Sequence, residues 1–296
     1  MLHLGVAAAI ALAAPADLRA PDGPRPTPIY GGQPSAPGAW PAVVAISIGN
    51  MLCTGTLVSS NVVLTAAHCL DTHPDVGSMR VHLGNDINGP NKSLAVIAYD
   101  FDPEFCAADT CKEDIHDFGY VVIADAQPQV TYPRVITAQD EWDEVMFVDA
   151  PITIVGFGLD EFMTTGVKRE VEVPITRFSK SGLEFQAGGD DLDSCQGDSG
   201  GPAFAKLSTG EYVLAGVTSR GYTCGKGGFY SAPIGGLCWL QQSSGLDLRP
   251  PGCGACDCVD TTPASGGCGC TSGAPDPAAL LVLPALALAL RRRRRR

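Results

Sequence analysis

The sequence predicts an all-β fold. Many short runs of β-branched and aliphatic residues follow one another along the 296-residue chain, as expected for strands. Clusters of Gly, Pro, Asn and Asp separate these runs, and such clusters form turns. No long stretch repeats its apolar residues with the 3.6-residue period of an amphipathic helix. These three observations together favour strands that are joined by turns.

The expected strands are short and lie throughout the middle of the chain. Each is a mostly β-branched or aromatic run that turn-forming residues bound. In chain order the clearest runs are AVVAISI at 42–48, VVLT at 62–65, YVVI at 120–123, ITIV at 152–155 and YVLAGV at 212–217.

Composition limits the class of protein. A hydrophobic content of 45% is ample for a buried core and excludes a chain that is disordered throughout. Twelve cysteines indicate an oxidising compartment and disulfide bonds. A formal net charge of −12 makes nucleic-acid binding unfavourable.

The N-terminal segment predicts export. Residues 4–14 are apolar, and Ala14-Pro15-Ala16 has the small residues of a signal-peptidase site, although no charged residue precedes the apolar stretch. We therefore expect residues 1–28 to be a signal peptide and a short pro-segment.

The C-terminal segments differ from the rest of the chain. Residues 247–277 are rich in Cys, Pro and Gly and predict a tether. Residues 278–296 combine an apolar stretch with six arginines. The apolar stretch is shorter than the roughly 17–25 residues of a typical membrane span, which favours a sorting signal. Together with Gly267-Cys268-Gly269-Cys270, it resembles the C-terminal sorting signals of myxobacterial surface proteins.

Two motifs carry the chemistry. Gly197-Asp198-Ser199-Gly200 offers a hydroxyl nucleophile, and Thr65-Ala66-Ala67-His68-Cys69 offers a base. An α/β-hydrolase would need a histidine after Ser199, and none follows it. The subtilisin order needs an acid before His68, where only Asp17 and Asp22 stand. The remaining order along the chain is His, Asp, Ser.

At these motifs the chain resembles the chymotrypsin/trypsin family of serine endopeptidases, and the resemblance extends over about residues 29–246. It implies a protease domain of two six-stranded antiparallel β-barrels with the active site between them, and a short C-terminal helix near 232–242. The other matching motifs are Ile29-Tyr30-Gly31-Gly32, Trp40-Pro41, Cys53-Thr54-Gly55, Gly156-Phe157-Gly158, Asp193-Ser194-Cys195-Gln196 and Ser219-Arg220-Gly221.

The resemblance implies a catalytic triad. His68 is expected to act as general base, Asp117 to orient it, and Ser199 to be acylated. The backbone N–H groups of Gly197 and Ser199 are expected to form the oxyanion hole. Asp114 competes for the role of the acid, but only Asp117 directly precedes the apolar run expected to enter the core.

The resemblance also implies a substrate pocket. Asp193 is expected at its base, beside Ser219, Gly221 and Gly228, and a buried carboxylate favours Arg or Lys in the substrate. The alternative is a solvated acidic loop, because Asp190 and Asp191 lie close by. Arg220 replaces an aromatic residue that is usual in the family, which suggests a preference for acidic substrate residues before the cleaved bond.

Activation is expected to involve the N-terminus. In the family a freed α-amino group pairs with an aspartate, and here these groups are Ile29 and Asp198. Pro28 departs from the Arg or Lys that many family zymogens carry before the activation bond. A trypsin-type cut at this bond is therefore doubtful, which leaves two alternatives: another protease cuts here, or maturation ends elsewhere.

The cysteines divide into three groups. The resemblance implies disulfides between Cys53 and Cys69 and between Cys195 and Cys224, and spacing alone indicates a third in a small acidic loop. The C-terminal cysteines form an even set for which pairing and zinc binding both stay open. The third pair is Cys106 with Cys111, and the even set is Cys238, Cys253, Cys256 and Cys258.

These observations predict a secreted, surface-anchored serine endopeptidase that cleaves proteins and peptides after Arg or Lys. It is expected to need no cofactor and no metal, to act as a monomer, and to meet membranes only through its C-terminal signal. The alternative is a protease-like binding or adhesion protein that stays silent because its N-terminus is never freed.

Overall fold

The structure is a computed structural model that describes residues 29–253 and 258–263. The expected signal peptide and pro-segment at 1–28 lie outside the described residues, and so does the apolar and arginine-rich segment at 278–296. Among the described residues, no helix has the length and apolar character needed to cross a membrane.

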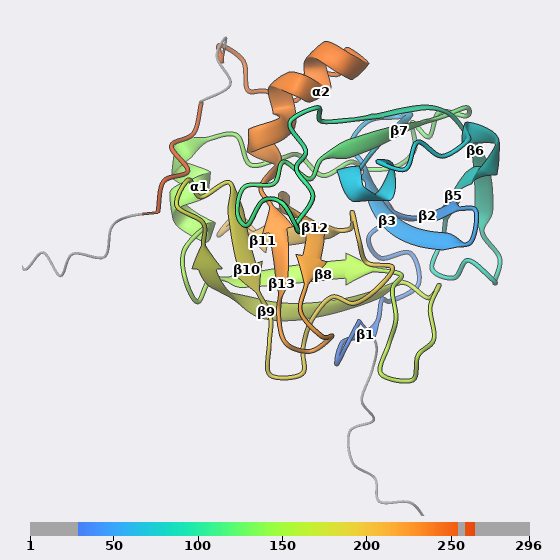
Figure 1. The fold of residues 1–296 in the computed structure, drawn as a ribbon, viewed down its shortest axis with the longest axis horizontal. Helices are drawn as coiled ribbons and strands as arrows, with labels where there is room; N and C mark the ends of the chain where they lie inside the picture. Colours follow the sequence, from blue (N-terminus) through green and yellow to red (C-terminus); the bar gives the residue numbers. More distant parts are fainter. Residues whose placement is uncertain (1–28, 254–257, 264–296) are drawn as a thin grey trace, which may run out of the picture. The chain divides into compact units, whose positions relative to one another are not determined.

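The first half of the described chain forms a closed antiparallel barrel, drawn in blue to green in Figure 1. Its strands hydrogen-bond in the order β2-β3-β4-β7-β6-β5, and β5 pairs with β2 to close the ring. The strands are β2 (Val43–Ile48), β3 (Met51–Leu57), β4 (Val62–Thr65), β5 (Met79–Leu83), β6 (Lys92–Phe101) and β7 (Gly119–Ile123).

The second half forms another closed barrel, drawn in yellow-green to orange in Figure 1. Six strands run in the order β9-β10-β13-β12-β11-β8, and β8 pairs with β9 to complete the ring; β1 (Gln33–Pro34) adds to its edge at β9. The six are β8 (Pro151–Gly156), β9 (Arg169–Phe178), β10 (Glu184–Ala187), β11 (Pro202–Lys206), β12 (Tyr212–Gly221) and β13 (Gly228–Ser231). The prediction of an all-β fold with two six-stranded barrels is confirmed.

The runs of β-branched residues form the interior of both barrels. All four residues of β4 are buried, while β9 alternates buried and exposed positions, as a strand with one face in the core must. Removing each Val, Ile or Leu side chain from water stabilises the fold by roughly 1.5–3 kcal/mol. The barrels are therefore rigid supports for the loops between their strands.

The short C-terminal helix is also present, but it starts later than expected. Residues Pro233–Gly236 form a 3₁₀ turn, and α2 (Leu237–Ser244) follows it. The helix ends at Gly245, whose φ of 75° closes the last turn in the left-handed region. Trp239 of α2 packs on Tyr120 with ring centroids 5.6 Å apart, so α2 contacts the first barrel.

One helix was not expected from the sequence. The helix α1 (Gln139–Val145) has only seven residues, which is too short to show a helical period. Its buried residues are Trp142 and Val145, three positions apart on one face.

The chain continues to pack on the second barrel beyond α2. Within the segment expected as a tether, residues 258–263, here named the C-terminal strap, return to the barrel surface. Val259 is 5% exposed, and the Asp260 N–H donates to Gln139 of α1 at 2.7 Å. The Thr261 hydroxyl donates to the Ser181 carbonyl at 2.6 Å.

Candidate active site

His68 is held at the edge of the first barrel. Strand β4 ends at Thr65, and buried Ala66 leads into the 3₁₀ turn Ala67–Cys69 that carries His68. The disulfide between Cys53 and Cys69 ties this turn to β3. The position of the imidazole is thus determined by a strand, a turn and a covalent link.

Asp117 orients the imidazole. One of its carboxylate oxygens lies 2.7 Å from His68 Nδ1, and the other accepts the His68 backbone N–H at 2.9 Å. The hydroxyl of Ser219, from β12 of the second barrel, also donates to Asp117, at 2.6 Å. The Asp117 side chain is 1% exposed, so three donors compensate a buried charge.

The pKa values of this pair move apart. Burial disfavours the charged imidazolium, but the charge of Asp117 and the hydrogen bond to it outweigh burial and raise the pKa of His68. Burial acts to raise the pKa of Asp117 as well, yet the charge of His68 and the donated hydrogen bonds lower it. The arrangement therefore favours an ionised Asp117 and stabilises the protonated form of His68.

The backbone of Ser199 lies near the Nε2 side of the imidazole. Cys69 Sγ is 4.0 Å from His68 Nε2 and 3.8 Å from the Ser199 carbonyl oxygen, so both groups lie against the same sulfur atom. The Thr54 N–H of β3 donates to that carbonyl at 2.8 Å. Among the described residues, no hydrogen bond joins the Ser199 hydroxyl to the imidazole. Such bonds are often long in enzymes without substrate.

The turn before Ser199 leaves two donors free. Gly197 has a φ of 98°, and a Cβ there would lie 2.9 Å from the Gly158 Cα, so glycine is required. The Thr54 hydroxyl donates to the Gly197 carbonyl at 2.8 Å and fixes this peptide. Within the described part of the chain, the N–H groups of Gly197 and Ser199 donate to no protein atom. They can therefore bind an oxyanion.

A cavity of about 120 Å³ lies beside Ser199. Its lining residues come from the Ser199 turn, from β12 and from the loop after β12. They are Ser194, Cys195, Gln196, Ser199, Thr218, Ser219, Arg220, Gly221, Tyr222 and Cys224. The disulfide between Cys195 and Cys224 joins two of its walls.

Asp193 lies behind the lining of this cavity. Its carboxylate accepts the N–H groups of Ser194 at 2.7 Å and Gly227 at 2.8 Å, and it is 1% exposed. A Cβ at Gly228 would lie 3.2 Å from the same carboxylate, so glycine keeps this approach open. Burial raises the pKa of Asp193 to about 6, because no cation lies beside it in the described residues.

Asp198 is a second buried carboxylate that has no cation beside it in the described part of the chain. Its oxygens accept the N–H groups of Gly158 at 2.7 Å and Cys195 at 2.8 Å, and it is fully buried. Burial raises its pKa to about 7. Ile29, the residue expected to supply the activating amine, is 1% exposed.

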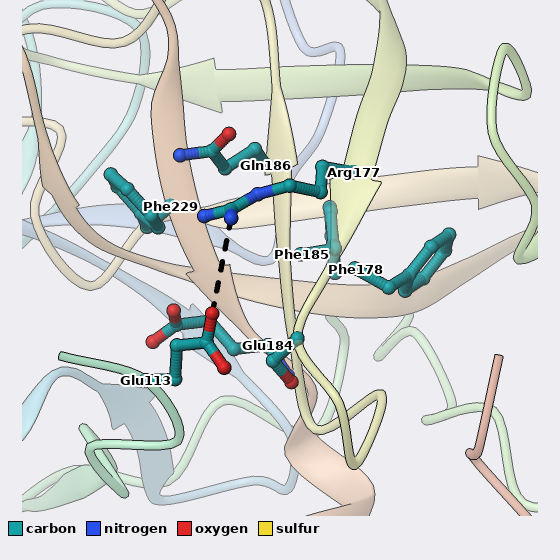
Figure 2. Close-up of a pocket in the computed structure, with 8 residues that line it drawn as sticks. Glu113, Arg177, Phe178, Glu184, Phe185, Gln186 and Phe229 are labelled. Atoms are coloured by element: carbon teal, nitrogen blue, oxygen red, sulfur yellow. Dashed lines mark hydrogen bonds and ion pairs between the residues drawn. The ribbon is translucent and has the colours of Figure 1, made fainter.

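Arg220 has an acidic partner that the sequence did not indicate. Its guanidinium donates to both carboxylate oxygens of Glu184, at 2.6 and 2.7 Å, and lies 4.2 Å from the centroid of the Phe229 ring. Figure 2 shows Glu184 and Phe229 in a small pocket, where Arg177 reaches toward Glu113. Because Glu184 neutralises Arg220, the preference for acidic substrate residues loses part of its electrostatic basis.

Several contacts of the site could not be read from the sequence. The hydroxyl of buried Tyr230 donates to Ser194 at 3.1 Å and supports the segment that holds Asp193. The ion pair of Arg220 with Glu184 could not be read from the sequence either, and nor could the hydrogen bond from Ser219 to Asp117. Each joins segments that are distant in the chain.

Asp114, the competing acid, is occupied elsewhere. It accepts the Ser179 hydroxyl at 2.6 Å, and within the described part of the chain no hydrogen bond joins it to His68.

Two further disulfides lie outside the site. Cys106 pairs with Cys111, as spacing suggested, and Cys253 pairs with Cys258 of the C-terminal strap. Cys256 lies outside the described residues.

Comparisons with known proteins agree with this geometry. Residues 29–235 match the family model described as Trypsin. Coagulation factor XII of Sus scrofa is 30% identical over 249 residues, which cover 72% of this chain and 39% of that protein. The proclotting enzyme of Tachypleus tridentatus is 29% identical over 254 residues, which cover 73% and 66%.

A third relative, serine proteinase stubble of Drosophila melanogaster, is 27% identical over 248 residues, which cover 72% of this chain and 29% of that protein. The chain thus spans only part of the length of these relatives, from 29% of stubble to 66% of the proclotting enzyme.

Proposed function

Because this chain belongs to the trypsin family of serine proteases, we propose that it is a secreted endopeptidase that cleaves peptide bonds after Arg or Lys. The observation that carries the proposal is the Asp117–His68 pair, 2.7 Å apart, with Nε2 and Ser199 lying against the same sulfur atom. Such an arrangement supplies the base, its orienting acid and the nucleophile of acyl transfer.

The proposed reaction begins at the Ser199 hydroxyl. His68 Nε2 takes the hydroxyl proton while the oxygen attacks the substrate carbonyl carbon. The carbonyl oxygen becomes an oxyanion that accepts the N–H groups of Gly197 and Ser199. Protonated His68 then gives its proton to the leaving amine, and an ester to Ser199 remains. A water molecule attacks that ester by the same steps and releases the acid.

Asp117 supports each proton transfer without being protonated. Its charge stabilises the imidazolium that forms in both halves of the reaction, and its hydrogen bond to Nδ1 keeps Nε2 available as the base. The Ser219 hydroxyl, which also donates to Asp117, links this support to the substrate cavity.

Cleavage after Arg or Lys is proposed from Asp193. This buried carboxylate directly precedes Ser194, which lines the cavity beside Ser199, and within the described residues it accepts hydrogen bonds from neutral donors. A cationic substrate side chain would compensate its charge, whereas an apolar side chain would leave it unpaired. Ser219, Gly221 and Gly228 are proposed to shape the path to it.

Maturation is proposed to free the amine of Ile29. That amine would supply the cation which Asp198 lacks, and it would stabilise the oxyanion-hole turn that contains Asp198. Since Pro28 precedes the bond, the activating protease must accept proline there. We also retain, as proposals from the sequence, a protease domain at 29–246, action as a monomer and surface anchoring through the C-terminal segment.

A silent binding or adhesion protein is the second candidate. Buried Asp198, which has no cation beside it among the described residues, favours this candidate, because a chain that keeps residue 28 joined to Ile29 cannot supply the amine.

One experiment separates the two candidates. Hydrolysis of arginyl, lysyl and citrullinyl amides is measured with the full chain before and after its N-terminus is set at Ile29, with Ser199→Ala as control. The proposal predicts cleavage of the two cationic amides only after trimming, and none by Ser199→Ala. The silent protein is favoured if the trimmed protein cleaves none of the amides, or if N-terminal sequencing of the protein from its natural source finds residue 28 still joined to Ile29.

A further inference from the structure

A group of three titratable side chains lies beside the triad and has no part in the proposed reaction. Among the described residues, Asp102, Glu104 and His116 bring one donor atom each within 4.8 Å of one another. Asp102 follows β6, and His116 directly precedes Asp117. From these residues we infer a binding site for a zinc-like divalent transition-metal ion.

The donor atoms lie at ion-pair distance but form no hydrogen bond with one another. The Asp102 side chain is 4% exposed; one of its oxygens accepts the Glu104 N–H at 2.9 Å, and the other accepts no hydrogen bond from the described residues. His116 Nδ1 is buried and also has no hydrogen-bond partner within the described part of the chain. A buried ring nitrogen that faces a carboxylate without a hydrogen bond is a polar group whose bonding capacity is not filled.

The spacing of these atoms fits a metal better than a hydrogen bond. Nδ1 of His116 lies 3.6 Å from the Asp102 oxygen and 3.5 Å from a Glu104 oxygen. An N–H···O hydrogen bond spans about 2.7–3.2 Å. Two ligands of a tetrahedral zinc ion, each about 2.0–2.1 Å from the metal, lie roughly 3.3 Å apart. If the distances from His116 Nδ1 to the two carboxylate oxygens shortened by a few tenths of an ångström, the three side chains could therefore bind one ion.

The backbone around the ligands is already fixed. The Asp102 N–H donates to the Phe118 carbonyl at 2.9 Å, and the Phe118 N–H donates to the His116 carbonyl at 2.8 Å. The loop between Glu104 and His116 is closed by the disulfide of Cys106 with Cys111. Only the exposed Glu104 side chain, 75% accessible, needs to move onto an incoming ion.

The donor set indicates the class of ion. One imidazole and two carboxylates suit zinc and similar transition metals, and a water molecule can complete four-coordination. Calcium prefers six to eight oxygen ligands, which these side chains do not offer. Because His116 adjoins Asp117, a bound ion would tie the end of β6 to the segment that orients His68. The ion is not a participant in the proposed hydrolysis.

Zinc binding to the full-length Ser199→Ala protein tests the site by titration calorimetry, without any need for activity. We expect one ion per chain at this site. His116→Asn, which suits the φ of 49° at this position, and Glu104→Gln should each weaken binding roughly tenfold or more. His73→Asn is the matched control, because His73 also has a positive φ, of 54°, and lies outside the group. It should bind zinc like its parent.

His68 and the two cysteines that follow residue 263, Cys268 and Cys270, are rival ligands, so His68→Ala and a variant that ends at residue 263 are titrated beside the others. If zinc binding survives His116→Asn and Glu104→Gln but is lost in either of these proteins, the inference is wrong. Since every protein in this experiment carries Ser199→Ala, its result does not depend on whether the chain is a protease.

Discussion

The Asp117 carboxylate is the residue on which the orientation of His68 depends. Asp117→Asn keeps the size of the side chain but removes the charge and the acceptor that hold the imidazole in the correct tautomer. We expect kcat for an arginyl amide to fall by roughly 10³- to 10⁴-fold. Asp114→Asn is the control, because Asp114 binds Ser179 instead, and its kcat should not change. Equal losses in both variants would contradict the assignment.

The pKa of His68 should reflect the same contact. In Ser199→Ala, an NMR titration of the imidazole is expected to give a pKa above 6.5. Asp117→Asn should lower it, since burial then acts without an opposing charge. For the active protein this means that kcat/KM rises with pH through a midpoint above 6.5, as neutral His68 becomes the base. A midpoint below 6.5 would show that Asp117 does not control the imidazole.

Asp193 should determine the preference for cationic substrates. Asp193→Asn is expected to lower kcat/KM for an arginyl amide by roughly 30- to 5000-fold, equivalent to about 2–5 kcal/mol. A leucyl amide, which gains nothing from the charge, serves as the matched substrate and should not lose activity. With unmodified protein, KM for the arginyl amide should rise as the pH falls below about 6, where Asp193 becomes neutral.

Single residues were predictable from sequence where a local motif defined them. The position of Asp117 before an apolar run favoured it over Asp114, and the structure brings Asp117 to His68. The role of Arg220 was not predictable, because its partner Glu184 belongs to a different strand, 36 residues earlier. Long-range ion pairs depend on strand register, which local sequence does not determine.

At the scale of elements, the strands were the most predictable part. Their β-branched runs match β2, β4, β7, β8 and β12 closely, because burial on both sides leaves a continuous apolar signal. The helix α1 was missed because two buried residues cannot establish a period. The C-terminal strap was missed because one buried valine in a polar stretch gives no signal at all.

The C-terminal strap should contribute to the stability of the second barrel. Val259→Asp places a charge at a buried position, and we expect the free energy of unfolding to fall by roughly 2–3 kcal/mol. Val148→Asp makes the same change at a valine that is 51% exposed and should have little effect. Denaturant unfolding of the full chain measures both. If the two variants unfold alike, the strap does not stabilise the barrel.

At the scale of the whole molecule, maturation should change how stability depends on pH. In the uncleaved, folded chain, burial raises the pKa of Asp198 to about 7, whereas a solvated aspartate has a pKa of 3.8. Burial therefore favours the protonated form. The contribution of Asp198 is therefore fully present below pH 3.8 and is lost as the pH rises to about 7. The loss is on the order of 4 kcal/mol.

Thermal unfolding of the uncleaved chain across the range from acidic to mildly alkaline pH measures this effect. Asp198→Asn should remove that part of the pH dependence, and so should release of the Ile29 amine in the unmodified chain. The dependence would persist after trimming if the amine does not reach Asp198.

The most direct test of the triad is the site and rate of modification by a fluorophosphonate, read by mass spectrometry on protein that begins at Ile29. The account predicts a single adduct on Ser199, formed far more slowly in His68→Ala and absent in Ser199→Ala. Modification at another residue, or an equal rate with and without the His68 imidazole, would contradict it.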